Sequence, residues 1–343
     1  MSSFIFTEPV GLAQVGLGAW GKNLLRNFVG LPGADVLWAC DVKESARAEA
    51  AQRYPGLQTC DRFEECVEDE RVEAVAIATE TPQHFPLAEA ALRAGKHVFV
   101  EKPLAQTADQ AERLVAIAAE RNLQLMVGHL LLYHPAFRLV ERLVREGELG
   151  DIRYLYSVRV NLGVVRQREN AFESLAPHDL AVALALVEAP PVAVSAQGQA
   201  YLQPSVEDVV FATVHFADGA LAHLHTSWLD PHKVRRTTVV GSRRMAVVDD
   251  MRPAEKVRLY DKGAEVTADG LTGYAEAISV RSGDIVIPKV EAAEPLRLEC
   301  EEFVACVREG RPARTDGRNG LAVVRLLDAA RRSLDDGGAQ VAL

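Results

Sequence analysis

VGLAQVGLGAWG, residues 10–21, begins as an apolar run and leads directly into the glycine pattern Gly16-x-Gly18-x-x-Gly21. This order is typical of a strand, a tight turn and a helix that together bind a dinucleotide. Gly16 permits the turn, Gly18 lets the backbone approach a pyrophosphate, and Gly21 lets the helix pack closely on the strand. The pyrophosphate is then expected at the helix N-terminus, where unpaired N–H groups and the helix dipole favour an anion.

Asp41 ends the next apolar run, residues 36–40, and lies twenty residues after Gly21. A carboxylate at this distance accepts hydrogen bonds from both ribose hydroxyls and repels a 2′-phosphate. We therefore expect NAD as the cofactor, with NADP disfavoured. A glycine-rich turn without a ligand is the alternative for an isolated pattern, but the strand before it, the helix after it and the acidic residue together favour a dinucleotide.

Segments typical of strands and helices alternate along the first 126 residues. Near-continuous apolar strands separated by helices predict a parallel, doubly wound sheet that is covered on both faces. The strands are expected at 10–15, 36–40, 57–60, 74–79, 97–100 and 124–127, with helices at 44–53, 63–69, 86–94 and 108–121 after the first one. The first domain, residues 1–127, is thus predicted to be a Rossmann domain that binds NAD.

The pattern changes after Gly128 to short alternating runs joined by tight turns. Such runs predict a large, mostly antiparallel open sheet, so the second domain, residues 128–343, is α+β and is expected to bind substrate and to form oligomers. Strands are expected at 152–160, 208–216, 220–228, 235–240 and 246–249, helices at 135–146, 175–187, 295–309 and 317–334, and long loops over 261–294.

Length and charge limit the possible partners. A chain of 343 residues exceeds what one hydrophobic core usually supports, which agrees with two domains. The formal net charge of −10 argues against nucleic acid or an anionic membrane as the main partner. No segment approaches the roughly 18–20 continuous apolar residues of a membrane span. Residues 1–9 lack the basic and apolar stretches of a signal peptide, so we expect a cytoplasmic protein.

The cysteines form no pattern typical of a metal site. Cys40, Cys60, Cys66, Cys300 and Cys306 include no CxxC pair and have no histidine at metal-ligand spacing. We interpret them as reduced thiols and expect no bound metal.

Polar side chains interrupt three apolar segments, at residues 79–84, 101–103 and 177–179. Ligands of parallel sheets bind at the carboxyl ends of the strands, so we expect the chemistry there, where the two domains meet. A lysine beside a nicotinamide can hydrogen-bond a substrate hydroxyl and stabilise the developing oxyanion, while a histidine takes the proton. On their own, Lys102 fits this role and an exposed surface position equally well, and His178 is more typical of a structural histidine.

With these motifs the chain resembles the Gfo/Idh/MocA oxidoreductases over nearly its whole length. The resemblance rests on the glycine pattern, on ATETPQH (78–84), AGKHVFVEKPLA (94–105) and EGELGDI (146–152), and on the helix that carries His178. It implies that Lys102 is the catalytic lysine, often preceding a cis peptide bond to proline, and that His178 is the proton acceptor. It also implies a homodimer or homotetramer. The residues expected to bind the cofactor are Gly16, Gly18, Ala19, Trp20, Gly21, Asp41, Thr79, Thr81, Pro82, His84, Glu101 and Lys102.

The chain also departs from the family pattern. Ser174 and Ala181 stand where many members carry aspartates, and Pro86 replaces a histidine. These differences argue against a simple polyol or inositol substrate. The segments LAPHD (175–179) and GHLLLYHP (128–135) are similar to the branch that oxidises C3 of UDP-N-acetylglucosamine or its uronic acid. We therefore expect hydride transfer from that carbon to NAD.

A nucleotide diphosphate requires cationic donors. The expected substrate-binding residues are His129, Tyr133, Arg159, Arg166, Arg168 and Asp179. For the three arginines the alternative is an exposed strand and loop face, and for Tyr133 it is core packing. Three other functions stay open: a free aldose or polyol dehydrogenase, an NAD-dependent redox glycosidase and a non-catalytic NAD-dependent regulator.

Overall fold

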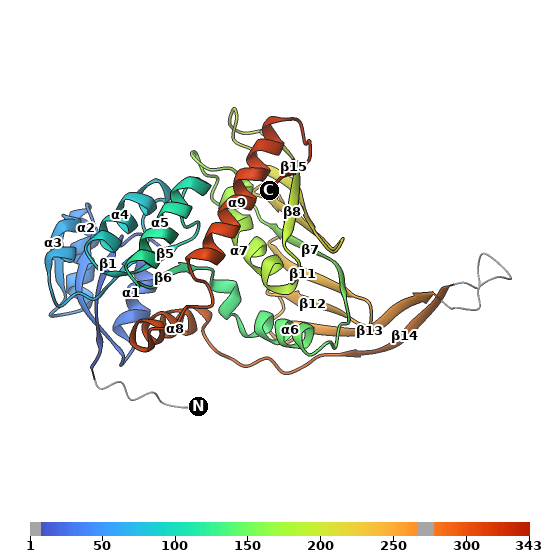
Figure 1. Ribbon diagram of the computed structural model, residues 1–343, viewed down its shortest axis with the longest axis horizontal. Helices are drawn as coiled ribbons and strands as arrows, with labels where there is room; N and C mark the ends of the chain where they lie inside the picture. The colour runs from blue at the N-terminus through green and yellow to red at the C-terminus, as the bar shows by residue number, and fades with distance from the viewer. Residues whose placement is uncertain (1–7, 267–277) are drawn as a thin grey trace. The chain divides into compact units, whose positions relative to one another are not determined.

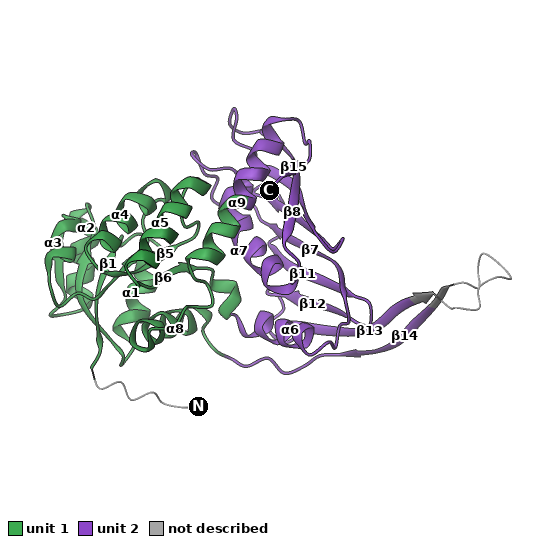
Figure 2. Ribbon diagram, viewed as in Figure 1, with its two compact units in different colours: residues 1–133, 293–325 green, residues 134–292, 326–343 purple. Residues whose placement is uncertain are grey.

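The computed structural model describes residues 8–266 and 278–343, which belong to two compact units (Figure 2). Unit 1 comprises residues 1–133 and 293–325, and unit 2 comprises residues 134–292 and 326–343. The sequence suggested one boundary after residue 127, whereas the chain returns to unit 1 near its C-terminus. Helix α8 (Pro295–Glu309) belongs wholly to unit 1, and the third boundary, between residues 325 and 326, falls inside α9 (Gly317–Asp335).

A six-stranded sheet forms the centre of unit 1, in the order β3-β2-β1-β4-β5-β6. Its strands are β1 (Val10–Val15), β2 (Ala34–Cys40), β3 (Gln58–Cys60), β4 (Ala74–Ile77), β5 (His97–Glu101) and β6 (Leu125–Gly128). All neighbouring strands are parallel. Every residue of β1, β4 and β6 is buried, as expected of a sheet that is covered on both faces. The predicted doubly wound parallel sheet is confirmed.

The helices that connect these strands follow the predicted order (Figure 1). They are α1 (Gly21–Val29), α2 (Glu44–Arg53), α3 (Phe63–Glu68), α4 (Thr81–Arg93) and α5 (Ala108–Glu120), with a 3₁₀ turn, η1, at Leu130–Tyr133. The prediction for α4 was wrong at its start, because the helix begins five residues before Pro86. Pro82 fits the first turn, where no N–H is needed, and the helix then accommodates Pro86 in its interior.

Helix α8 packs against the sheet of unit 1 beside α1. The rings of Phe28 (α1), Phe99 (β5) and Phe303 (α8) meet edge to face, with centroids 5.7–6.3 Å apart. All three side chains are fully buried. This aromatic cluster explains why a helix that follows β5 by about two hundred residues in sequence completes the N-terminal unit.

Unit 2 is built on a nine-stranded sheet in the order β14-β13-β12-β11-β7-β10-β9-β8-β15. The strands are β7 (Ile152–Val160), β8 (Pro191–Gln199), β9 (Val209–Phe216), β10 (Leu221–Ser227), β11 (Val234–Gly241), β12 (Met245–Asp249), β13 (Val257–Val266), β14 (Ile278–Val286) and β15 (Val341–Ala342). Among the described strand pairs of this nine-stranded sheet, only β7–β10 is parallel. The mostly antiparallel sheet is therefore confirmed.

Two helices of this unit precede β8: α6 (Pro135–Arg145) and α7 (Ala171–Leu186). Helix α7 packs on β7, β9 and β10. In β9 and β10 buried residues alternate with more exposed ones, so the strands present one face to the core and the other outward.

The loop predicted over residues 261–294 is wrong in part. Strands β13 and β14 pair there, and part of the segment, 267–277, lies outside the described residues. Residues 280–286 are all exposed and include charged side chains such as Arg281 and Asp284, so the apolar alternation that marks a half-buried strand is absent. Strand β8 was likewise not anticipated. No helix in the described part of the chain is long and apolar enough to span a membrane.

The aromatic cluster makes α8 a structural part of the dinucleotide unit. We expect Phe303→Ala to lower the free energy of unfolding by about 3–5 kcal/mol, because it opens a cavity among fully buried rings. The exposed Val42→Ala control is expected to stay within about 0.5 kcal/mol of the unmodified protein. Urea denaturation followed by circular dichroism measures both. Equal stability of the two variants would contradict this packing.

Candidate functional site

The glycine turn after β1 has the geometry that each glycine was predicted to provide. Gly16 has a φ of +90°, and a Cβ there would collide with the carbonyl oxygen of Ala78. A Cβ on Gly21 would collide with the carbonyl oxygen of Gly16, so this glycine is needed for close packing of α1. A Cβ on Gly18 would meet no atom within 4 Å. The backbone at Gly18 is therefore open to a ligand.

Helix α1 begins next to this open backbone. No side chain caps its first turn, and the first turn contains no acidic residue. The N–H groups of Lys22 and Asn23 donate to the carbonyl oxygens of Gly18 and Trp20, so the helix start offers a negatively charged group the positive end of its dipole. Together with the open space at Gly18, these features fit the pyrophosphate of a dinucleotide.

Asp41 lies directly after β2 and is fixed beside the glycine turn. Its Oδ2 accepts a hydrogen bond from the N–H of Leu17 at 2.7 Å, and its Oδ1 accepts one from the N–H of Lys43 at 2.8 Å. Each carboxylate oxygen retains a lone pair for a ribose hydroxyl. Arg47 donates to the carbonyl oxygens of Asp41 and Val42, so a cation also lies at this corner.

Lys102 follows the last residue of β5. The preceding Glu101 is 8% exposed and accepts hydrogen bonds from Trp20 Nε1–H at 2.5 Å and from the N–H of Lys102 at 3.3 Å. Burial raises the pKa of Glu101 to about 7, although the Trp20 hydrogen bond and the Lys102 charge lower it. The Lys102–Pro103 peptide bond is cis, as the resemblance implied. The Trp20 contact joins the glycine turn to the strand end that carries Lys102.

His84 is buried beneath this strand end. Its Nδ1 lies 2.7 Å from the carbonyl oxygen of Pro103, and its Nε2 lies 3.2 Å from that of Thr79. A neutral imidazole has one N–H and donates to only one of these carbonyls, and burial lowers the pKa of His84. The side chain therefore links the ends of β4 and β5. Its predicted contact with the cofactor stays a prediction, as do those of Ala19, Thr79, Thr81 and Pro82.

Two buried groups near the Glu101–Lys102 strand end, His129 and Glu299, show strong electrostatic effects. His129 is 1% exposed, and neither ring nitrogen has a hydrogen-bond partner among the described residues. Burial and then the charge of Lys102 lower its pKa to about 3, so it is neutral. Glu299 on α8 is fully buried, and its carboxyl oxygens also lack partners in the described chain. Burial and then the charge of Glu101 hold its pKa well above the usual value.

Sequence reasoning missed Glu299. It lies in the run Glu299-Cys300-Glu301-Glu302, which is typical of an exposed helix face and carries no signal of burial. His129 and Tyr133 were expected to open the second domain, but both belong to unit 1. Tyr133 is 3% exposed and its hydroxyl lies 3.0 Å from Thr315 Oγ1, which matches the alternative of core packing.

In unit 2, His178 lies on α7 and is half-buried. The next residue, Asp179, forms a buried ion pair with Arg159 of β7, with N–O distances of 2.5 and 3.1 Å, and accepts a hydrogen bond from Ser157 at 2.6 Å. Burial lowers the pKa of Arg159, but the charge and hydrogen bonds of Asp179 more than offset this effect. The ion pair fixes α7 on the sheet next to His178. The predicted contacts of Arg159 and Asp179 with substrate stay predictions.

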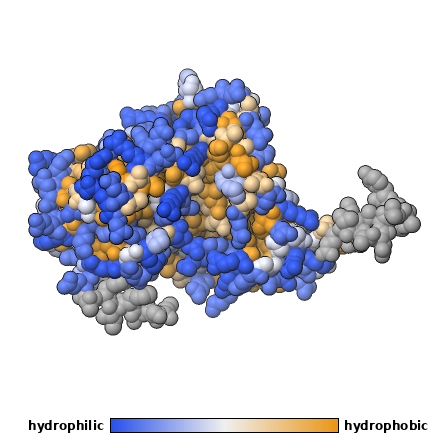
Figure 3. Space-filling model, viewed as in Figure 1, coloured by the Kyte–Doolittle hydropathy of each residue, from blue (hydrophilic) through white to orange (hydrophobic). Residues whose placement is uncertain are grey.

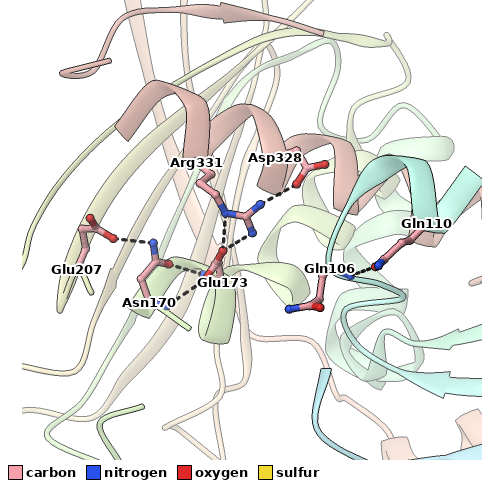
Figure 4. A network of polar contacts seen from close by, with 7 residues as sticks. All are labelled: Gln106, Gln110, Asn170, Glu173, Glu207, Asp328 and Arg331. Carbon is pink, nitrogen blue, oxygen red and sulfur yellow. Dashed lines mark hydrogen bonds and ion pairs between the residues drawn. The ribbon is translucent and has the colours of Figure 1, made fainter. Parts of the chain in front are cut away.

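A second polar network fixes the start of α7 (Figure 4). Asn170 and Glu173 form a capping box, and each side chain accepts the other residue's backbone N–H. Arg331 of α9 donates to Glu173, and Asn170 donates to Glu207 at 2.8 Å. Glu173 thus joins the helix cap to α9.

The remaining predicted arginines, Arg166 and Arg168, are exposed on the segment between β7 and α7. Arg166 lies 3.5 Å from Glu169, and its carbonyl oxygen accepts a hydrogen bond from Gln203. This exposure agrees with the alternative of a loop face and leaves the predicted phosphate contact untested.

Family models match both parts of the chain. The oxidoreductase family with an NAD-binding Rossmann fold matches residues 10–129, and the GFO/IDH/MocA C-terminal domain matches residues 137–247. The chain is 32% identical over 254 residues to UDP-N-acetylglucosamine 3-dehydrogenase of Acidithiobacillus ferrooxidans, covering 74% of this chain and 76% of that protein. It is 25% identical over 338 residues to inositol 2-dehydrogenase of Rhizobium meliloti, covering 95% and 97%.

Solved structures also align with the chain over nearly its whole length. UDP-N-acetylglucosamine 3-dehydrogenase GnnA from Acidithiobacillus ferrooxidans aligns with a TM-score of 0.79 at 26% identity, over 95% of this chain and 98% of that one. GenD2 from gentamicin A biosynthesis, in complex with NAD, aligns with a TM-score of 0.81 at 25% identity, over 98% and 97%.

The Arg159–Asp179 pair generates a stability prediction. Asp179→Ala is expected to lower the free energy of unfolding by about 3–5 kcal/mol, because it leaves a buried guanidinium unpaired. The double variant Arg159→Met/Asp179→Leu should regain most of that loss, since no buried charge remains. Urea denaturation of Asp179→Ala, of the single variants Arg159→Met and Asp179→Leu, and of the double variant checks this. If the loss in free energy of unfolding in the double variant equals the sum of the losses in the single variants, the pairing is contradicted.

Proposed function

We propose that this chain, which belongs to the Gfo/Idh/MocA oxidoreductase family, oxidises C3 of a UDP-linked N-acetylamino sugar or its uronic acid with NAD. The observation that carries the chemistry is the Trp20–Glu101 hydrogen bond, which joins the dinucleotide turn to the strand end bearing Lys102. The substrate class is supported by 32% identity to a UDP-N-acetylglucosamine 3-dehydrogenase over three quarters of the chain.

In the proposed reaction the sugar hydroxyl loses its proton and C3 loses a hydride. Lys102 donates a hydrogen bond to the hydroxyl oxygen and stabilises the negative charge that develops there. His178 accepts the proton as general base, and the C3 alcohol becomes a ketone. When bound, NAD⁺ supplies the hydride acceptor at C4 of its nicotinamide. Neither a metal ion nor a covalent enzyme intermediate takes part in this proposal.

The proposed roles of Lys102 and His178 predict that substituting either residue slows hydride transfer without weakening NAD⁺ binding. Lys102→Met and His178→Asn are each expected to lower the rate of hydride transfer by about 10²–10⁴-fold while NAD⁺ affinity changes little, since neither residue holds the pyrophosphate. Stopped-flow absorbance of the reduced nicotinamide measures the rate, and calorimetry measures NAD⁺ binding. Lys289→Met and His232→Asn, on exposed positions, are the matched controls. Unchanged hydride transfer in either active-site variant refutes its role.

NAD is proposed over NADP because Asp41 presents a carboxylate beside the glycine turn. Arg47 lies at the same corner, and an arginine is the group that accommodates a 2′-phosphate in NADP enzymes. The Asp41 carboxylate repels that phosphate, whereas Arg47 already donates to two backbone carbonyls. The balance therefore favours NAD.

Asp41→Ala tests this balance. The variant is expected to bind NAD⁺ roughly 10–100-fold more weakly, because hydrogen bonds to a charged group contribute about 1.5–3 kcal/mol, and to lose its preference over NADP⁺. The control Asp35→Ala removes an exposed aspartate from the opposite end of β2. Affinities for both dinucleotides come from calorimetry. If the preference for NAD⁺ over NADP⁺ is unchanged, a residue other than Asp41 distinguishes the ribose 2′-hydroxyl from a 2′-phosphate.

Inositol-type oxidation is the second candidate, because the resemblance to inositol 2-dehydrogenase covers almost the whole chain. Ser174 and Ala181 argue against it, since they replace aspartates that many family members carry beside the histidine. Purified protein with NAD⁺ and a panel of UDP-amino sugars, their uronic acids, free aldoses and inositols separates the candidates. Reduced nicotinamide formed only with the UDP sugars supports the proposal. Reduced nicotinamide formed only with inositols or aldoses would contradict the proposed substrate but not the proposed roles of Lys102 and His178.

We also propose a homodimer or homotetramer formed through the outer face of the unit 2 sheet. Tyr154, Phe211 and Leu221 are each 38–45% exposed there, and apolar residues gather over the strands of this unit (Figure 3). An uncovered apolar sheet face of this kind is typical of an association surface. Because α7 packs on the other face, the partner of this one is proposed to be a second copy.

Phe211→Asp combined with Leu221→Asp is expected to shift the protein from oligomer to monomer, because it places charges on the proposed contact. Light scattering after size-exclusion chromatography measures the mass. Val164→Asp, on an exposed loop position, is the control. A monomeric unmodified protein would contradict the proposal.

A further inference from the structure

Three cysteines from three different elements meet beside the dinucleotide turn. Cys40 ends β2, Cys60 ends β3 in parallel register with it, and Cys66 lies on α3. Their Sγ atoms all lie within 4.8 Å of one another, and the sulfurs of Cys60 and Cys66 are 3.5 Å apart. All three are at least 94% buried. The fold thus creates a compact group of three sulfurs from residues 20 and 6 positions apart in sequence.

We propose that Cys40, Cys60 and Cys66 form a binding site for a soft metal ion held by three sulfur ligands. Metal–thiolate bonds of about 2.3 Å place three sulfurs around a central ion about 4 Å apart. The observed spacing brackets that value, so binding requires shifts of a few tenths of an ångström rather than refolding. Each thiol that binds exchanges its S–H proton for a metal–sulfur bond, and the protons pass to solvent.

Carboxylates lie near the three sulfurs. Asp41 and Asp61 act electrostatically on Cys40, and Glu65 acts on Cys60. Arginines accompany two of them, since Arg47 lies 3.9 Å from Asp61 and Arg62 lies 3.1 Å from Glu65, so the choice of ion rests on the sulfur ligands. Hard ions such as Mg²⁺ prefer oxygen ligands, whereas thiolates select soft ions such as Cu(I) and the zinc group.

The number of sulfur ligands further limits which metal ions suit the site. Within the described part of the chain the group contains no fourth histidine, cysteine or carboxylate. Structural zinc sites almost always have four protein ligands. The site is therefore better suited to ions that accept three sulfurs, for which Cd²⁺ is a spectroscopic probe. Simple packing of three small apolar side chains is the alternative, since all three belong to the core of unit 1.

Binding at this site is expected to act on the dinucleotide turn. The carbonyl of Cys40 accepts the N–H of Gly16 at 2.8 Å, and the carbonyl of Cys60 accepts the N–H of Asp41 at 3.2 Å. A shift of the sulfurs that moves these carbonyls would make the ion and NAD⁺ change each other's affinity by the same factor. This consequence rests on the proposed cofactor, whereas ion binding itself does not.

The experiment titrates reduced, metal-free protein with Cd²⁺ and follows the ultraviolet sulfur-to-cadmium charge-transfer band. One equivalent is expected to bind, and excess Mg²⁺ should not displace it. Cys66→Ala should weaken binding by at least about 100-fold, because loss of supporting residues alone already costs 10–100-fold at metal sites. Cys306→Ala, a buried cysteine on α8 outside the group, should bind like the unmodified protein.

Cadmium-113 NMR of the unmodified protein counts the sulfurs directly, so the test does not depend on the folding of Cys66→Ala. A shift typical of three sulfur ligands supports the site. No binding of one equivalent, a shift typical of oxygen or nitrogen ligands, or equal loss in Cys306→Ala overturns it. Calorimetric NAD⁺ affinity with and without Cd²⁺ then tests the coupling, and an unchanged affinity would refute the coupling alone.

Discussion

The close approach of α1 to the turn after β1 is the constraint on which the rest of unit 1 depends. Because Gly21 lacks a Cβ, the helix start lies against the carbonyl of Gly16. The turn is thereby held in position to donate the Gly16 N–H to Cys40 and the Leu17 N–H to Asp41. Trp20, from the same turn, reaches Glu101. One packing contact thus links the ends of β1, β2 and β5, where most of the proposed cofactor residues lie, whereas Thr79, Thr81, Pro82 and His84 follow β4.

Electrostatics adds a second constraint around Lys102. Two buried carboxyl groups, Glu101 and Glu299, act on each other, and burial disfavours the charged form of both. Glu101 receives hydrogen bonds from Trp20 and from the Lys102 backbone, whereas Glu299 has no partner in the described chain. The hydrogen bonds from Trp20 and Lys102 therefore favour the charged form of Glu101 over that of Glu299.

Sequence patterns predicted those features that depend on local chemistry. The glycine spacing, the buried strands of unit 1 and the position of Lys102 at a strand end follow from short segments, and the structure agrees with them. Features set by distant partners were not predictable. Nothing in the charged run around Glu299 indicates that α8 packs on Phe28 and Phe99. The expectation of no metal site likewise rested on sequence spacing, and spacing cannot reveal that β2, β3 and α3 bring three sulfurs together.

The same reasoning applies to α7, where neighbouring residues have different surroundings. Asp179 follows His178 directly but points to Arg159 in the sheet, so its carboxylate is occupied by a structural ion pair. Residues four before and three after His178 share its helix face, and these are Ser174 and the fully buried Ala181. A carboxylate at the Ala181 position would be buried and costly unless it were paired. The helix thus presents the histidine without an acidic neighbour at these two positions.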